Sequence, residues 1–263
     1  YLGRFFLLLF LLGVALIVAA LIMLVPDLLN YKQSNDTYEA LKENYISEKA
    51  ENTEVAEETE GDDSWWYTDV DVKLEELQQV NADIIGWIRF DNLEQLSYPV
   101  LYSGDDEKYL RTDIYGNQTI AGCIFMEGMN TPDFQDYHTI LYGHNMKNGS
   151  IFGTLDSYKK ADYWKEHPLV RFYVDGEPRT YEVFAAVETQ VLYEDEDGFR
   201  YYRYDGDIPE EEYDELVTWL RGHSDYDTEI VPEYEDQILM LSTCSYHTKN
   251  GRFVVAARRV AEL

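Results

Sequence analysis

The sequence predicts a mainly β domain, either an all-β barrel or a sandwich, behind a single transmembrane helix. Short apolar segments separated by turn residues recur from about residue 80 to the end of the chain, which is typical of such sheets. An uncharged apolar run near the N-terminus supplies the helix, and a stretch rich in Glu and Asp lies between the two. We therefore expect a transmembrane anchor at 1–26, an acidic extracellular stalk or linker at 27–70 and a folded domain at 71–263.

The apolar run from Phe5 to Val25 has the length of a membrane span, because about 20 helical residues at about 1.5 Å each cross a bilayer. It is longer than the apolar core of a signal peptide, and no small-residue cleavage site follows it. Arg4 on the short side favours a cytoplasmic N-terminus. We expect a single-pass protein of the cell membrane with its folded domain outside the cell. The chain opens on Tyr1 rather than Met, so we also expect some sequence to precede it.

The net charge of −30, from 51 acidic and 21 basic residues, excludes nucleic acid as a partner, because phosphates require a cationic surface. The acidic run from Glu51 to Asp63 has little to bury, so we expect it to be solvated. Trp65 to Tyr67 are expected either to pack on the folded domain or to lie at the membrane interface. The cluster from Glu194 to Asp197 is expected to be a solvated loop rather than a Ca²⁺ site, and no metal site or cofactor motif is predicted.

Helices and strands are expected in the following order. Apolar spacing predicts a helix over 71–81, and helical segments are also expected at 37–44 and between 149 and 168. A helix at 208–221 has a Pro near its first turn, an acidic N-terminal end and an Arg-Gly step at its end. Its buried face is expected to carry Tyr213, Leu216, Val217 and Leu220. The predicted strands are 98–101, 119–126, 139–142, 170–174, 180–191, 238–243 and 253–260.

The C-terminal region predicts a β-hairpin that brings a thiol beside a guanidinium. The apolar run that starts at Gln237 ends at Cys244, a polar turn with an Asn-Gly pair follows, and Arg252 opens a second strand. If the two strands pair, Cys244 and Arg252 lie together at one end of the sheet. A neighbouring cation favours the nucleophilic thiolate, and a nucleophile needs a proton-transfer partner. His144, which follows a short apolar strand and a Gly, is the best placed candidate.

This combination resembles the sortases, and the class B sortases most closely. The motif on the Cys strand is Met240-Leu241-Ser242-Thr243-Cys244, with Arg252 opening the next strand, and the family has Thr where Met240 stands. The second family motif, Tyr-Gly-His-Asn-Met, is complete from Tyr142 to Met146. The resemblance implies the eight-stranded β-barrel of that family, with N-terminal helices and an added helix before the Cys strand.

The resemblance also implies the roles of the site residues. Cys244 would be the nucleophile, His144 the general acid and base, and Arg252 the cation that stabilises the oxyanion. Thr243 and Ser245 are weaker candidates for contacts with substrate or oxyanion, the first through its hydroxyl and the second through its backbone N–H.

Other residues of the same types are expected to serve the structure. His247 is the one competitor of His144, and its position in the polar turn predicts solvent exposure. Cys123 lies in an apolar segment, so we expect a buried thiol rather than a disulfide partner of Cys244. The residues expected to be structural or at the surface, away from catalysis, are His138, His167, His223, Arg258 and Arg259.

The resemblance implies a membrane-anchored transpeptidase on the surface of a Gram-positive cell. It would cleave surface proteins after Thr in a C-terminal sorting signal, through a thioester, and transfer them to an amine of a peptidoglycan precursor. Three alternatives remain open at this point: a pilin-polymerising sortase whose acceptor is a protein Lys, a hydrolytic cysteine protease with the same Cys-His-Arg site, and a non-catalytic membrane-tethered binding module.

Overall fold

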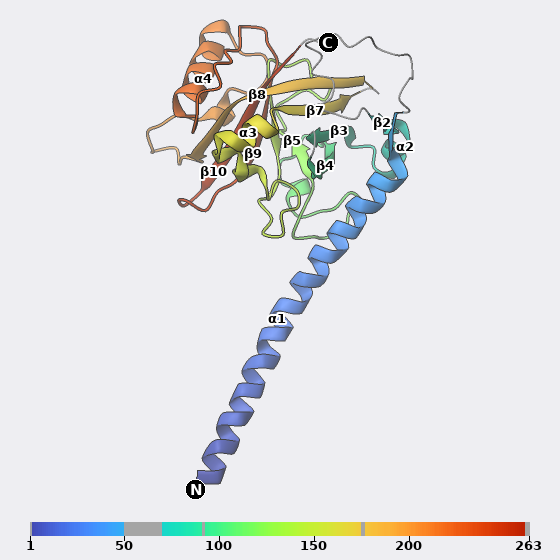
Figure 1. Ribbon diagram of the computed structural model, residues 1–263, viewed down its shortest axis with the longest axis vertical. Helices are drawn as coiled ribbons and strands as arrows, with labels where there is room; N and C mark the ends of the chain where they lie inside the picture. The colour runs from blue at the N-terminus through green and yellow to red at the C-terminus, as the bar shows by residue number, and fades with distance from the viewer. Residues whose placement is uncertain (1, 50–69, 91–92, 175–176, 261–263) are drawn as a thin grey trace.

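A computed structural model describes residues 2–49, 70–90, 93–174 and 177–260, and it consists of a β-barrel at the end of one long N-terminal helix (Figure 1). The acidic run from Glu51 to Asp63 and the aromatic residues from Trp65 to Tyr67 lie outside the described residues. The helix, α1, runs over Leu2–Tyr45. The mean hydropathy of its most apolar 18-residue segment is 3.2, and none of that segment is buried. By length and composition, α1 is a candidate membrane span, in agreement with the predicted anchor.

Eight strands close the barrel in the order β10-β8-β7-β3-β4-β5-β6-β9. Most neighbours pair antiparallel, but β4 with β5 and β6 with β9 pair in parallel. The eight-stranded barrel implied by the resemblance is therefore confirmed. The strands are β3 (Ile84–Phe90), β4 (Leu93–Leu101), β5 (Ile124–Met126), β6 (His138–Tyr142), β7 (Leu169–Val174), β8 (Glu177–Gln190), β9 (Ile238–Cys244) and β10 (Gly251–Arg259).

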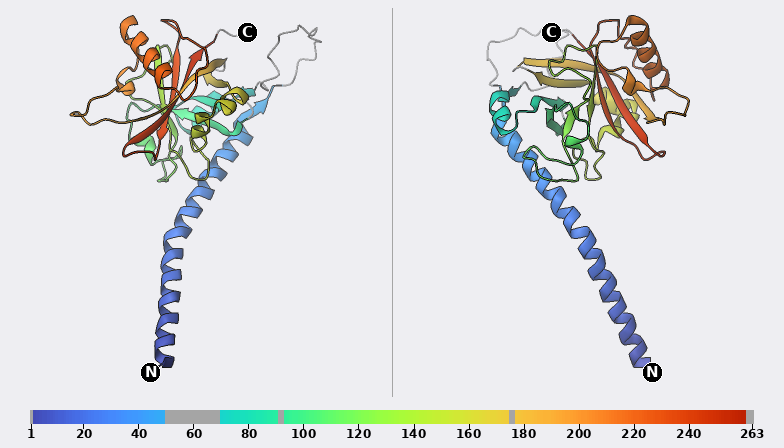
Figure 2. Two further views of the ribbon diagram at one scale, coloured as in Figure 1. Left: turned by 60° about the vertical axis from the view of Figure 1, so that its left-hand side comes forward. Right: turned by 180° about the vertical axis from the view of Figure 1, so that it is seen from behind.

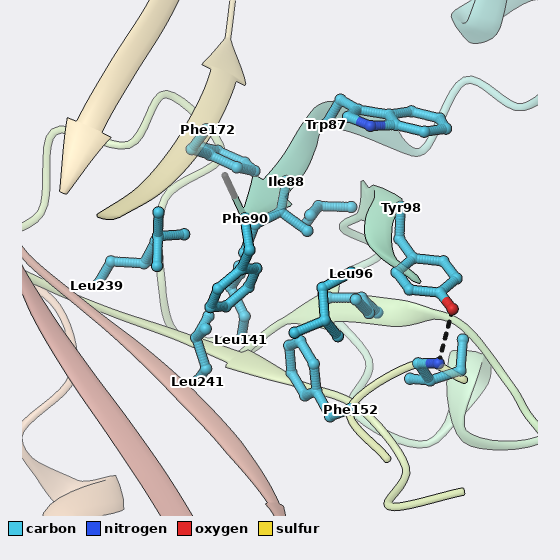
Figure 3. Close-up of a cluster of buried hydrophobic side chains, with 14 of the residues drawn as sticks. Trp87, Ile88, Phe90, Leu96, Tyr98, Leu141, Phe152, Phe172, Leu239 and Leu241 are labelled. Atoms are coloured by element: carbon cyan, nitrogen blue, oxygen red, sulfur yellow. Dashed lines mark hydrogen bonds between the residues drawn. The ribbon is translucent and has the colours of Figure 1, made fainter. Parts of the chain in front are cut away.

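The strand β9 is buried on both faces, which explains its continuous apolar sequence. Leu239 and Leu241 point into the barrel, where they pack with aromatic residues such as Phe90 of β3 (Figure 3). Ile238 and Met240 alternate with them and belong to a second buried cluster outside the barrel wall. This alternation follows from the two-residue period of a strand.

The second cluster is covered by the helix α4, Glu210–His223, which closely matches the predicted helix. Its buried residues are the four that the sequence predicts, Tyr213, Leu216, Val217 and Leu220. Two shorter helices, the 3-10 helix η3 (Leu155–Lys159) and α3 (Ala161–Glu166), occupy the region where a helical segment was expected.

The helix α1 extends further than the expected anchor. It continues through Pro26 to Tyr45, and its last part packs on the barrel (Figure 2), with Tyr38 and Leu41 buried in the main core. These two residues are three positions apart, so they lie on the same face of the helix. The first part of the segment expected as a stalk is therefore a docked helix.

Two predicted elements differ from the structure. The helix expected at 71–81 is shorter, α2 at Leu74–Val80, because Val70–Val72 forms the strand β2. The residues of β2 alternate between buried and exposed, and they pair with β1, Ile46–Glu48, which follows α1 directly. Pairing with β1, more than 20 residues earlier in the chain, thus makes Val70–Val72 a strand although the local spacing of apolar residues favours a helix.

The strand predicted at 119–126 is reduced to β5, its last three residues. Gly122 interrupts it with a φ of 59°, and a Cβ atom at this position would lie 2.4 Å from the carbonyl oxygen of Tyr109. The backbone therefore turns away from the sheet and packs against a neighbouring loop at a position that only glycine fits.

The buried face of α4 predicts how much stability is lost when one of its side chains is shortened. Leu216→Ala should lower the free energy of unfolding by about 2–5 kcal/mol, because it leaves a cavity in a buried cluster. Thr218→Ala on the exposed face should change it by less than about 0.5 kcal/mol. Urea unfolding followed by tryptophan fluorescence measures both. Equal losses in the two variants would show that this face does not pack on the barrel.

Candidate active site

A pocket of about 360 Å³ opens at the barrel rim where β6 and β9 end. Cys244, His144 and Arg252 all lie in its wall, so the structure brings the three predicted site residues together. The remaining lining residues are Asp106, Leu110, Phe125, Glu127, Tyr142, Gly143, Val191, Tyr201, Tyr202, Ser242 and Thr243.

His144 reaches the pocket because β6 and β9 are parallel. Tyr142 lies opposite Ser242 in the register, and the next N–H, that of Gly143, donates to the Ser242 carbonyl at 3.2 Å. Parallel strands end at the same rim. The residues that follow them, His144 and Cys244, therefore meet, although they are distant in the sequence.

Two side-chain hydrogen bonds fix the segment that carries His144 to the Cys strand. The Thr243 hydroxyl donates to the Gly143 carbonyl at 2.7 Å, and the Asn145 side-chain amide donates to the Cys244 carbonyl at 2.9 Å. These bonds come from the residues on either side of His144. They hold the backbone at the imidazole in place from both directions.

Arg252 reaches the pocket through the hairpin that the sequence predicts. In the antiparallel pairing of β9 and β10, Arg252 lies directly opposite Cys244. Its guanidinium also donates to the Gly251 carbonyl at 3.0 Å. The turn between the strands closes with a hydrogen bond from the Ser245 N–H to the same carbonyl at 2.9 Å.

The environment of His144 favours the neutral form of its imidazole. Burial lowers the pKa of His144, and the positive charges of Arg111 and Arg252 lower it further, while the hydrogen bond to the Leu110 carbonyl opposes the shift. The Nε2 atom lies 2.7 Å from that carbonyl oxygen. A carbonyl can only accept, so Nε2 carries a proton and Nδ1 holds the lone pair of the neutral ring.

The two weaker candidates, Thr243 and Ser245, already make hydrogen bonds within the protein. The N–H of Ser245 closes the hairpin, and its hydroxyl contacts Glu188 at 3.2 Å, so this residue offers no free donor to an oxyanion and does not line the pocket. The hydroxyl of Thr243 is buried and already donates to Gly143. Thr243 therefore helps to position the loop of His144, and it also lines the pocket.

The other histidines lie apart from the pocket wall. His247 is in the hairpin turn, where its Nδ1 lies 2.8 Å from the Ser245 hydroxyl and 3.6 Å from Glu188. His138 is fully buried beside the Tyr204 carbonyl, and burial lowers its pKa to about 4. Structural or surface positions are also found for His167, which packs on Tyr163, for His223, which bonds the Trp219 carbonyl, and for Arg258 and Arg259, which contact Glu182 and Gln237.

The two cysteines are both free. Cys123 is buried, as predicted, and its thiol donates to the Thr112 carbonyl at 3.3 Å. Burial raises the pKa of Cys123 to about 12, so this thiol is inert as a nucleophile near neutral pH. Among the described residues, no group of three or more His, Cys, Asp or Glu side chains is arranged to hold a metal ion.

The pocket also contains two carboxyl groups, those of Asp106 and Glu127, that were not among the predicted site residues. Glu127 is only 8% exposed, and burial raises its pKa to about 7, with the nearby charges of Asp106 and Asp205 adding to the shift. Glu127 thus takes up a proton near neutral pH. The feature of the sequence that could have identified Glu127 is its position directly after the apolar strand β5.

Comparisons with known proteins identify the family of this chain. A family model described as "Sortase domain" matches residues 89–260. Sortase B of Listeria monocytogenes is 31% identical over 193 residues, which cover 72% of this chain and 75% of the relative. Sortase B of Staphylococcus aureus is 28% identical over 190 residues, which cover 71% of this chain and 74% of the relative.

Solved structures of class B sortases have the same fold. Sortase B from Bacillus anthracis in complex with AAEK1 gives a TM-score of 0.70 at 27% identity, over 89% of this chain and 100% of that chain. The Staphylococcus aureus sortase B–substrate complex gives a TM-score of 0.64 at 27% identity, over 72% and 84%. The chain therefore belongs to the sortase family of cysteine transpeptidases, in which its relatives are the class B sortases.

Proposed function

We propose that this chain cleaves a C-terminal sorting motif after a Thr residue and joins the new carboxyl end to an amine. The observation that carries the proposal is the convergence of Cys244, His144 and Arg252 in the wall of one pocket. Two solved relatives add support, since one is a Staphylococcus aureus sortase B–substrate complex and another is a sortase B complexed with Gly3.

The first half of the reaction forms a thioester. The sulfur of Cys244 attacks the carbonyl carbon of the Thr, and its proton passes to Nδ1 of His144, the nitrogen that holds the lone pair. The carbonyl oxygen becomes an oxyanion, and the Arg252 guanidinium stabilises it by about 3 kcal/mol, typical of one such donor. The C–N bond breaks, and the departing amine takes the proton from His144.

The second half of the reaction reverses these steps with a new amine. The nitrogen of the incoming amine attacks the thioester carbonyl, and neutral His144 removes a proton from that nitrogen. The C–S bond breaks, Cys244 regains its proton from His144, and a new amide leaves the pocket. Water in place of the amine would give hydrolysis through the same intermediate.

The partners and the location belong to the same proposal. The donor substrates are surface proteins that carry a sorting signal, and the acceptor is an amine of a peptidoglycan precursor, with a pilin Lys as the other choice. The apolar part of α1 anchors the chain in the cell membrane as a single span. Arg4 on its short side favours a cytoplasmic N-terminus and an extracellular catalytic domain.

A transfer assay tests the proposed reaction. The full chain in detergent is incubated with a library of donor peptides, each of which contains a Thr within a varied pentapeptide. Each incubation also contains triglycine, a Lys peptide, or no amine acceptor. Mass spectrometry should detect an amide product in one of the amine arms. If only hydrolysed peptide forms in every arm, the chain is a protease and the transfer proposal is wrong.

Replacing each cysteine in turn tests the nucleophile. Cys244→Ala should abolish labelling by a thiol-reactive sorting peptide and lower turnover by roughly 1,000-fold or more, because it removes the attacking atom. Cys123→Ala is the matched control, since this thiol is buried, and it should keep both labelling and turnover. Labelling that survives in Cys244→Ala would assign the reaction to another residue.

The charge of Arg111 should influence the pH dependence of the reaction. It lowers the pKa of His144, so Arg111→Gln should raise that pKa and move the acid limb of the kcat/KM profile to higher pH. The shift should shrink at 0.5 M salt, because mobile ions screen the charge over about 4 Å. An acid limb that stays in place in low salt would exclude His144 as the group that titrates there.

A further inference from the structure

We propose that the docked part of α1, residues 30–41, positions His144 by holding the loop whose Leu110 carbonyl binds the imidazole. This inference rests on the catalytic role proposed for His144. It assigns the membrane-proximal helix a part in the active-site geometry, in addition to its part as an anchor.

Two side chains of this part of α1, those of Asn30 and Tyr38, contact the same short segment of the barrel domain, while Asn35 accepts a hydrogen bond from Asn148 at 3.4 Å in another loop. Asn30 accepts hydrogen bonds from the Thr119 hydroxyl at 2.9 Å and from the Ile120 N–H at 3.1 Å. Tyr38, two helical turns further on, donates its hydroxyl proton to the Gly122 carbonyl at 2.8 Å, in a buried bond. The helix therefore holds the stretch from Thr119 to Gly122 at both of its ends.

That stretch lies directly against the loop that carries Leu110. A Cβ atom on Gly122 would be 2.4 Å from the Tyr109 carbonyl oxygen and 2.8 Å from the Leu110 carbonyl oxygen, so the backbones are in contact without a side chain between them. The Cys123 N–H then donates to the Tyr109 carbonyl at 3.0 Å. A displacement of Gly122 must therefore move Tyr109 and Leu110 with it, because packed backbone leaves no room for independent motion.

Leu110 transmits this position to the imidazole. Its carbonyl oxygen lies 2.7 Å from Nε2 of His144, and its side chain lines the same pocket. The bond sets the ring orientation and leaves the lone pair on Nδ1. Tyr38, Gly122, Leu110 and His144 thus form a continuous series of contacts from α1 to the proposed acid and base.

The test is Tyr38→Phe in the full chain, which deletes one hydroxyl and keeps the ring. We expect kcat to fall about threefold to tenfold with little change in KM, because a slightly displaced catalytic group slows the reaction without weakening substrate binding. The acid limb of the kcat/KM profile should move to lower pH, since the Leu110 bond favours protonated His144. The ¹⁵N NMR signal of His144, assigned with His144→Gln, should show loss of the single tautomer.

The matched control is Tyr213→Phe on α4. This tyrosine is also buried, and its hydroxyl also donates to a backbone carbonyl, that of Asp236, at 2.8 Å. Its loss should lower stability by a similar amount and leave the kinetics and the His144 signal unchanged. If Tyr38→Phe behaves in the same way as Tyr213→Phe, α1 only stabilises the fold and the inference is overturned.

Two further variants keep the test decisive. If Tyr38→Phe does not fold, Asn30→Ala carries the test, because Asn30 is partly exposed and holds the same stretch at its other end. If His144→Gln retains full turnover, the proposed function fails. The NMR measurement still decides the positioning of the imidazole in that case, since it does not depend on activity.

Discussion

The parallel pairing of β6 with β9 is the constraint on which the candidate site depends. It places Tyr142 beside Ser242, so the residues that follow the two strands emerge at one rim of the barrel. The return strand β10 then brings Arg252 back to that rim opposite Cys244. Three chemically different groups meet because three adjacent strands begin or end at the same edge. The hydrogen bonds from Thr243 and Asn145 then fix the loop that carries His144.

The same strands are held in place by burial on both faces. One set of alternate residues, including Leu239 and Leu241, fills the barrel, and the other set packs under α4. A strand that is apolar on both faces cannot shift by one residue without changing which residues face each core. The helix α4 therefore contributes to the site although none of its residues lines the pocket. It keeps the register of the strand that presents the thiol.

The sequence was sufficient for features that depend on neighbouring residues or on a family motif. The hairpin register, the buried face of α4 and the meeting of Cys244 with His144 all follow from such patterns. The docking of Tyr38 could not be predicted. The local sequence around a helical tyrosine does not show whether its side chain is exposed to solvent or packed on another part of the chain. The sequence also did not show that the N–H of Ser245 is occupied by the hydrogen bond that closes the hairpin. The burial of Glu127 likewise depends on a loop more than 20 residues away that carries Asp106.

Pro26 interrupts the backbone hydrogen bonds of α1 between its apolar part and its docked part. Proline has no N–H, so the carbonyl of Ile22, one turn earlier, has no helical donor, and a helix bends most easily at such a turn. This turn separates the apolar run from the docked residues. If the apolar run lies in a bilayer, a bend at this turn would tilt that run relative to the docked part of α1. Such a bend would leave the contacts of Asn30 and Tyr38 with the barrel domain in place.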